Sequence, residues 1–110
     1  MTNRQKRFAL NEAISKLQSV QFTYQNESRV GNPHAIGFTT ENNEVVRIYQ
    51  TEGHSSSGLS FPDRKGVNFR LFDLSHLDKV EILTDVFKVH KAFKKDDDAI
   101  DWNKAPNKQV

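Results

Sequence analysis

The sequence contains no cysteine, which excludes a disulfide framework and a thiolate zinc site. This absence fits a reducing compartment, and we expect a cytoplasmic protein. No stretch approaches the roughly 18 consecutive apolar residues that a membrane-spanning helix needs, so we expect no membrane partner. The basic residues before Phe8 lead into no apolar run, so we expect no secretory signal either.

Neither sign of charge is in large excess. The 110 residues include 16 Lys and Arg and 14 Asp and Glu, which gives a net charge of +2. Such mild basicity permits an anionic partner without requiring one, and a dedicated duplex-DNA binder usually has a more lopsided surface. A chain of this length is expected to form one domain with a small margin of stability.

Residue types that carry catalysis or bind metals are present but scattered. No pair among His34, His54, His76 and His90 has the spacing of a helical metal site. The acidic run 96–98 lacks the glycine and the terminal glutamate of a calcium loop. No nucleophile has a base beside it in sequence, so we expect no enzyme, no metal site and no cofactor.

Hydrophobic periodicity predicts one helix followed by strands. Leu10, Ile14 and Leu17 fall on one stripe of a helix over about 8–18. Alternation and turn residues predict five strands, at 20–24, 29–39, 44–52, 67–74 and 79–83, and leave 85–93 ambiguous between strand and helix. Pro33 cannot donate to a central ladder, so the second strand is expected to bend there.

The predicted fold class is therefore mainly β (α+β). An N-terminal helix precedes a five-stranded, strongly bent antiparallel barrel of the Sm-like or SH3-like kind. We expect this domain to span 1–90. The polar tail 91–110 is expected to be loosely ordered, with Ile100 and Trp102 as its anchors.

The order of these features resembles a WYL domain, a bacterial and phage module. The matching stretches are 10–14, 20–24, 29–34, 46–53 and 69–77, and the match spans roughly 8–88. Val45, Val46 and Arg47 stand about where the family has its Trp-Tyr-Leu tripeptide, and Asp73 and His76 occupy positions that are usually basic. The chain resembles the module standing alone, without the helix-turn-helix segment that often precedes it.

The resemblance implies an Sm-like fold that serves as a regulatory or sensing module. It implies a nucleic-acid or nucleotide-like ligand. It also implies a ligand role for Arg70, on the family's arginine-bearing last strand, and for Arg29, which matches a family position near the bend.

Side-chain alternation leads to a similar site by another route. Arg47 and Tyr49 share one face of their strand, and Arg70 and Phe72 share one face of theirs. If these strands are antiparallel neighbours, two guanidinium groups and two rings could lie on one surface. Guanidinium groups bind phosphate and rings stack on bases. The alternative is that Tyr49 and Phe72 are core under the helix.

Three further residues are candidates for binding an anion. His34 follows Pro33 and could donate to the anion expected at Arg29, or it could be a hydrogen-bonded histidine beside the bend. His54 and Ser55 open a loop whose hydroxyls and backbone amides could form an anion nest, or whose tip could simply be flexible. Arg29 itself could equally be a solvated residue at the end of a strand.

The sequence therefore predicts a regulatory or sensing module that binds a nucleotide or single-stranded nucleic acid. The alternative is a protein-interaction or self-assembly module of Sm-like fold, because small barrels pair their edges readily. Homo-oligomer formation stays open.

Overall fold

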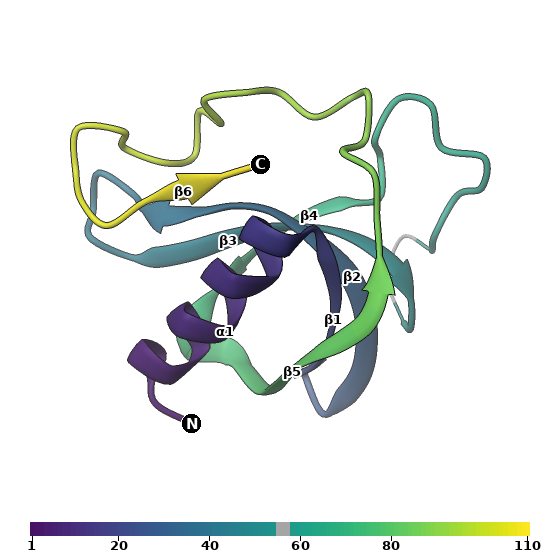
Figure 1. Ribbon diagram of the computed structural model, residues 1–110, viewed down its shortest axis with the longest axis horizontal. Coiled ribbons are helices and arrows are strands. Elements are labelled where there is room, and N and C mark those ends of the chain that lie inside the picture. The colour runs from purple at the N-terminus through teal and green to yellow at the C-terminus, as the bar shows by residue number, and fades with distance from the viewer. Residues whose placement is uncertain (55–57) are drawn as a thin grey trace.

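Among the described residues, one α-helix, one short 3-10 helix and a six-stranded antiparallel sheet make up the fold (Figure 1). The computed structural model describes residues 1–54 and 58–110. The elements are α1 (Asn3–Lys16), β1 (Gln18–Tyr24), β2 (Glu27–Phe38), β3 (Glu44–Glu52), β4 (Phe69–Asp73), the 3-10 helix η1 (Leu74–His76), β5 (Leu77–Val86) and β6 (Lys108–Gln109).

The helix α1 begins earlier than its apolar stripe predicted. The Thr2 hydroxyl accepts from the Gln5 amide N–H, and the Gln5 side chain accepts from the Thr2 N–H, which is a capping box. Leu17, with φ of 53°, ends the helix in a left-handed conformation. The described residues include no helix long and apolar enough to cross a membrane.

The sheet runs in the order β4-β3-β2-β1-β5, and β6 adds to β2. Gln25 and Asn26, with φ of 52° and 62°, make the tight turn between β1 and β2. The register of β2 against β3 shifts between Pro33 and Ala35, so the bend predicted at Pro33 is confirmed.

The β4–β5 connection bends the sheet strongly. β4 and β5 are the two ends of the strand order, yet only the three residues of η1 separate them along the chain. The sheet therefore curls around α1 (Figure 1). It is not closed into the predicted barrel, because no ladder joins β4 to β5 among the residues that the structure describes.

The sheet buries side chains on both faces. On its inner face, the one covered by α1, the main core joins the helix to all five long strands: Leu10, Ala13, Ile14, Val20, Phe22, Ile36, Val46, Ile48, Phe72, Leu74, Leu77 and Val80. On its outer face, Ala35, Val45 and Ile100 form a second core with Phe93 and Trp102 packed against it.

The C-terminal segment covers that outer face, which differs from the loosely held tail that we expected. Ile100 is only 4% exposed, and the Trp102 indole donates to the Asp97 carbonyl at 3.0 Å. β6 pairs with β2, and the Val110 N–H donates to the His34 carbonyl at 2.9 Å. Ile100 and Trp102 thus anchor the segment as predicted, but the packing extends to its end (Figure 1).

Candidate functional site

The predicted arginine–aromatic surface is not formed. β3 and β4 are antiparallel neighbours as assumed, but Arg47 lies opposite Leu71, and Arg70 lies opposite Ile48. Residues directly opposite each other share a face, so Arg47 and Tyr49 are on the outer face and Arg70 is on the inner one. A register that differs by one residue moves a whole set of side chains to the other face, and this is the reason that the prediction is wrong.

The two aromatic residues of that prediction also separate. Phe72 is core under α1, with its ring centroid 5.1 Å from those of Phe22 and Tyr24. Tyr49 is buried on the outer face instead, where it stacks on His90 at 4.5 Å. The alternative reading is thus confirmed for Phe72 and wrong for Tyr49.

Arg29 is buried on the inner face, and so it is not a solvated strand-end residue. It is 5% exposed, and its guanidinium lies 4.9 Å from the centre of the Tyr24 ring. Its one hydrogen bond to a described residue goes to Gln50 Oε1 at 3.4 Å, and its Nε has no partner. No carboxylate within residues 1–54 and 58–110 forms an ion pair with it.

His34 is a fully buried histidine beside the bend. Its Nε2 accepts from the His90 N–H at 3.1 Å, so its Nδ1 carries the proton and donates to the Asn32 carbonyl at 2.8 Å. Burial, reinforced by the nearby charge of His90, lowers the pKa of His34 to about 4 against the weaker effect of the Asn32 bond. The ring is therefore neutral near pH 7 and uses both nitrogens within the protein.

Two further predicted residues, Arg70 and His54, lie near the loop between β3 and β4. Arg70 holds two ends of this loop together, because it donates to Val67 O at 2.7 Å and to Gly58 O at 3.3 Å. The His54 side chain is exposed, with Nδ1 3.8 Å from the Glu27 carboxylate. Ser55 lies outside the described residues.

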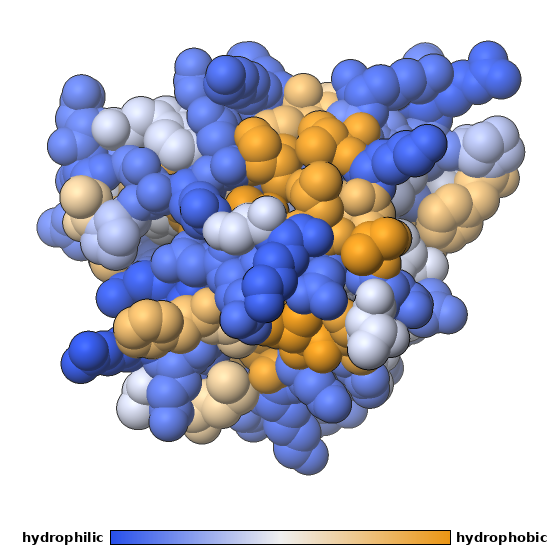
Figure 2. Space-filling view, in the orientation of Figure 1, coloured by the Kyte–Doolittle hydropathy of each residue, from blue (hydrophilic) through white to orange (hydrophobic). Residues whose placement is uncertain are grey.

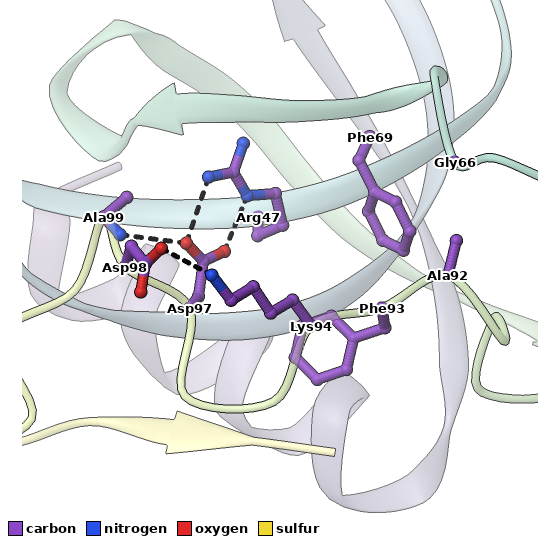
Figure 3. A pocket seen from close by; sticks show the side chains of 9 residues that line it. All are labelled: Arg47, Gly66, Phe69, Ala92, Phe93, Lys94, Asp97, Asp98 and Ala99. Atoms are coloured by element: carbon purple, nitrogen blue, oxygen red, sulfur yellow. Dashed lines mark hydrogen bonds and ion pairs between the residues drawn. The ribbon is translucent and has the colours of Figure 1, made fainter.

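A hollow of about 300 Å³ opens on the outer face, and we call it the outer-face hollow (Figure 3). It lies between β3, β4 and the C-terminal segment. The rings of Phe69 and Phe93, with centroids 6.1 Å apart, form one side of it. Its lining is Arg47, Gly66, Phe69, Ala92, Phe93, Lys94, Asp97, Asp98 and Ala99.

Two ion pairs form the other side of the outer-face hollow. Arg47 binds Asp97 in a two-pronged contact, with Nε–Oδ2 at 2.7 Å and Nη2–Oδ1 at 3.1 Å. Burial favours the neutral acid, but the bonds from Arg47 and from the Ala99 N–H outweigh it and lower the pKa of Asp97. Lys94 pairs with Asp98 at 2.7 Å in solvent, and this hydrogen bond raises the pKa of Lys94.

The loop of residues 58–67 borders the outer-face hollow and is held by buried polar side chains. The Asn68 side chain pairs with the backbone N–H and carbonyl of Ser60, at 3.0 and 2.8 Å. The Asp63 carboxylate accepts from the N–H groups of Val67 and Asn68, at 2.9 and 2.8 Å. These bonds fix the loop while Phe61 stays 60% exposed.

Exposed cations gather where this loop meets the C-terminal segment. A Cβ built on Gly66 would lie 2.9 Å from Ala92 Cβ, so the two segments touch at the rim of the hollow. Arg64, Lys65 and Lys91 precede these contact residues and are exposed. Sequence patterns could not predict this rim, because its members come from two irregular segments that only the fold brings together.

The site offers no cluster of metal ligands. Within the described part of the chain, no three His, Asp or Glu side chains are placed to hold a metal ion. Its chemistry is that of aromatic faces, ion pairs and a cationic rim.

No protein-family model, curated protein or solved structure matches this chain. The resemblance to WYL domains stays a prediction from the sequence, and the function is argued from the site.

Proposed function

We propose that this domain is a regulatory or sensing module that binds a nucleotide, free or within a single strand, at the outer-face hollow. The observation that carries the proposal is that the rings of Phe69 and Phe93 lie beside a rim where exposed Lys and Arg residues are found. A ring face stacks on a base with a gain of ~1–3 kcal/mol, and Lys and Arg attract phosphate. Binding rather than catalysis is the role that this combination supports.

The parts of such a ligand fit different parts of the site. The rings of Phe69 and Phe93 suit a base, and a volume of about 300 Å³ suits one base better than a larger body. Lys94 and Asp98 offer a donor and an acceptor for the polar edge of that base. Lys65 and Lys91 are exposed and directly precede Gly66 and Ala92, which touch at the rim, so their charges would attract a phosphate attached to that base.

We further propose that the fold is an Sm-like or SH3-like small barrel whose edges do not close, and that the chain is a WYL-like module standing alone. The helix-first order and the η1 corner between the edge strands support this relationship. The lack of cysteine supports a cytoplasmic location.

Fluorescence anisotropy with a labelled oligothymidine and with a labelled adenine nucleotide tests the function. We expect the double variant Lys65→Glu, Lys91→Glu to bind about tenfold more weakly or worse, because each reversal removes an attraction and adds a repulsion. The matched control is Lys16→Glu, Lys79→Glu, which has the same net charge but changes exposed residues of α1 and β5. Equal losses in the two doubles would contradict the assignment of the rim.

A second variant tests the ring wall. Phe93→Leu keeps an apolar side chain but removes a stacking face, and we expect about tenfold weaker binding. Urea unfolding of the same variant checks that the outer face stays folded. Wild-type affinity in a folded Phe93→Leu protein would remove the base-stacking part of the proposal.

Self-assembly is the second candidate, and an apolar surface favours it. Figure 2 shows hydrophobic side chains gathered between α1 and β5 and along the chain that follows β5. Phe8 and Ile82 line a groove there, and Val86 is 74% exposed on β5, which among the described strands pairs only with β1. An unpaired edge strand beside apolar side chains can add to a second copy.

Light scattering after nuclease treatment separates the two candidates. A dimer that survives nuclease and dissociates on Val86→Lys would favour assembly. A monomer at all concentrations would leave nucleotide binding as the proposal.

A further inference from the structure

Lys6 is a charged residue on the buried face of α1. It precedes Leu10 by one turn, and only 5% of it is exposed. Its Nζ donates to the carbonyl oxygen of Leu74 at 2.8 Å. An ammonium group has three N–H donors, and in a buried position it also needs a counter-charge.

The described residues supply that counter-charge only at a distance. No carboxylate among them forms an ion pair with Lys6. The Asp73 carboxylate is bound to the N–H and the hydroxyl of Ser75, at 2.9 and 2.6 Å. The Ser75 hydroxyl is the main cause of the lowered pKa of Asp73, and the charges of His76 and Lys6 contribute less.

A polar hollow of about 370 Å³ lies against Lys6, and we call it the η1 hollow. It is bounded by α1, by η1 and by the turn between β1 and β2. Its lining includes Thr23, Asn26 and His76, whose side chains carry a hydroxyl, an amide and an imidazole that can donate hydrogen bonds. Asp78 is the acid in its lining, and one oxygen of that acid accepts from the Lys79 N–H.

We propose that the η1 hollow binds the phosphate group of a free phosphate or a small phosphomonoester, with Lys6 as its counter-charge. The hollow has room for such a group together with water, since one water occupies about 30 Å³ of liquid. Charge-assisted hydrogen bonds from Lys6 and neutral ones from Thr23 and Asn26 would surround the anion. The η1 hollow shares no lining residue with the outer-face hollow, so this site does not rest on the proposed function.

An NMR titration of the full chain tests the site with two probes, inorganic phosphate and glycerol phosphate, at constant ionic strength. We expect saturable shifts of the backbone amides of 23–26 and 75–78 with one probe or both. Binding of phosphate alone would identify the free anion, and binding of both would identify the phosphate group. The Lys6→Met variant removes the charge and keeps a long side chain, and should bind about tenfold more weakly or worse.

If Lys6→Met disturbs the helix, a second binding variant and a control variant still test the site. Asn26→Gly removes the amide at a residue with φ of 62°, which glycine tolerates, and should weaken binding several-fold. Lys16→Met, on the exposed side of the same helix, should bind like the wild type. The proposal fails if neither probe gives saturable shifts, if sodium chloride reproduces them, or if Asn26→Gly binds like the wild type.

Discussion

His34 lies at the centre of the aromatic packing on the outer face. His34 contacts the rings of Phe69, Phe87 and Phe93, with centroids 4.9 to 5.2 Å away, and its Nε2 accepts the N–H of His90. Protonation of Nε2 would place a charge among aromatic rings and turn an acceptor into a donor that faces another donor. The neutral ring is therefore part of what keeps the C-terminal segment on the sheet.

The low pKa of His34 predicts that acid destabilises the domain. The folded pKa of about 4 lies below the ordinary value of 6.5, so the unfolded chain binds more protons between these values. Stability is then complete above about pH 6.5 and falls as the pH drops towards 4, by roughly 3 kcal/mol at most. Urea unfolding of wild type and His34→Gln at pH 7 and pH 5 measures this. A wild-type loss no larger than that of the variant would contradict the role of His34.

Because Arg47 is paired with Asp97, we expect loss of this ion pair to lower the stability of the domain and to strengthen its binding of an anion. Asp97→Asn removes the charge that neutralises Arg47 at the outer-face hollow, so the domain should lose about 1–3 kcal/mol of unfolding free energy. The freed guanidinium should also bind an anionic nucleotide more tightly. Urea unfolding and anisotropy measure the two effects. Asp98→Asn is the control for the unfolding measurement, because its pair with Lys94 lies in solvent and should contribute little to stability.

At the scale of elements, a strand with a clear hydrophobic pattern was predicted with accurate bounds, and elements or ends with a weak pattern were not. β3 was predicted at 44–52 and spans Glu44–Glu52, because its alternating apolar residues are bounded by clear turns. The start of α1 was missed although Thr2 and Gln5 have capping-box spacing. β6 has two residues, which are too few to show a periodicity. It is a strand because its backbone pairs with β2.

The burial of Ile100 indicates that this side chain contributes to the packing of the C-terminal segment against the sheet. It is 4% exposed against Ala35 and Val45, and truncation to alanine would leave a cavity beneath the segment. We expect Ile100→Ala to lower the free energy of unfolding by about 2–4 kcal/mol and to speed hydrogen exchange at 93–110. Val89→Ala, at a residue that is 46% exposed, is the matched control and should change little. Unchanged exchange would mean that hydrogen bonds alone retain the segment.

At the scale of the whole molecule, the two cores share the strands β2 and β3. Side chains of both strands enter the main core on the inner face and the second core on the outer face. Loss of either strand would therefore dismantle both cores, and we expect a single unfolding transition. Trp102, the one tryptophan of the sequence, reports the outer face by fluorescence, while circular dichroism reports the sheet. Urea midpoints that differ between these probes would show that the faces unfold separately.

The candidate site depends on this whole-molecule arrangement, which explains why so little of it could be predicted. Arg47 was found because arginine on an alternating strand is a visible signal, and it lines the outer-face hollow. Tyr49 supports the hollow only indirectly, through its contact with Phe69 at 4.9 Å. Arg70 was predicted to share the surface of Arg47, and Arg29 to bind an anion near the bend. Both lie on the inner face, since strand register is a tertiary property that alternation within one strand does not determine.

The corner at η1 has a consequence for how fast the chain folds. Because it sends β5 back to the first strand, the curl of the sheet is completed by a ladder that joins Val20 to Ile82, two residues that are far apart in the sequence. Closing such a long loop costs conformational entropy before the contacts of the ladder form and stabilise it. We therefore expect this ladder to form late and the domain to fold slowly for its size.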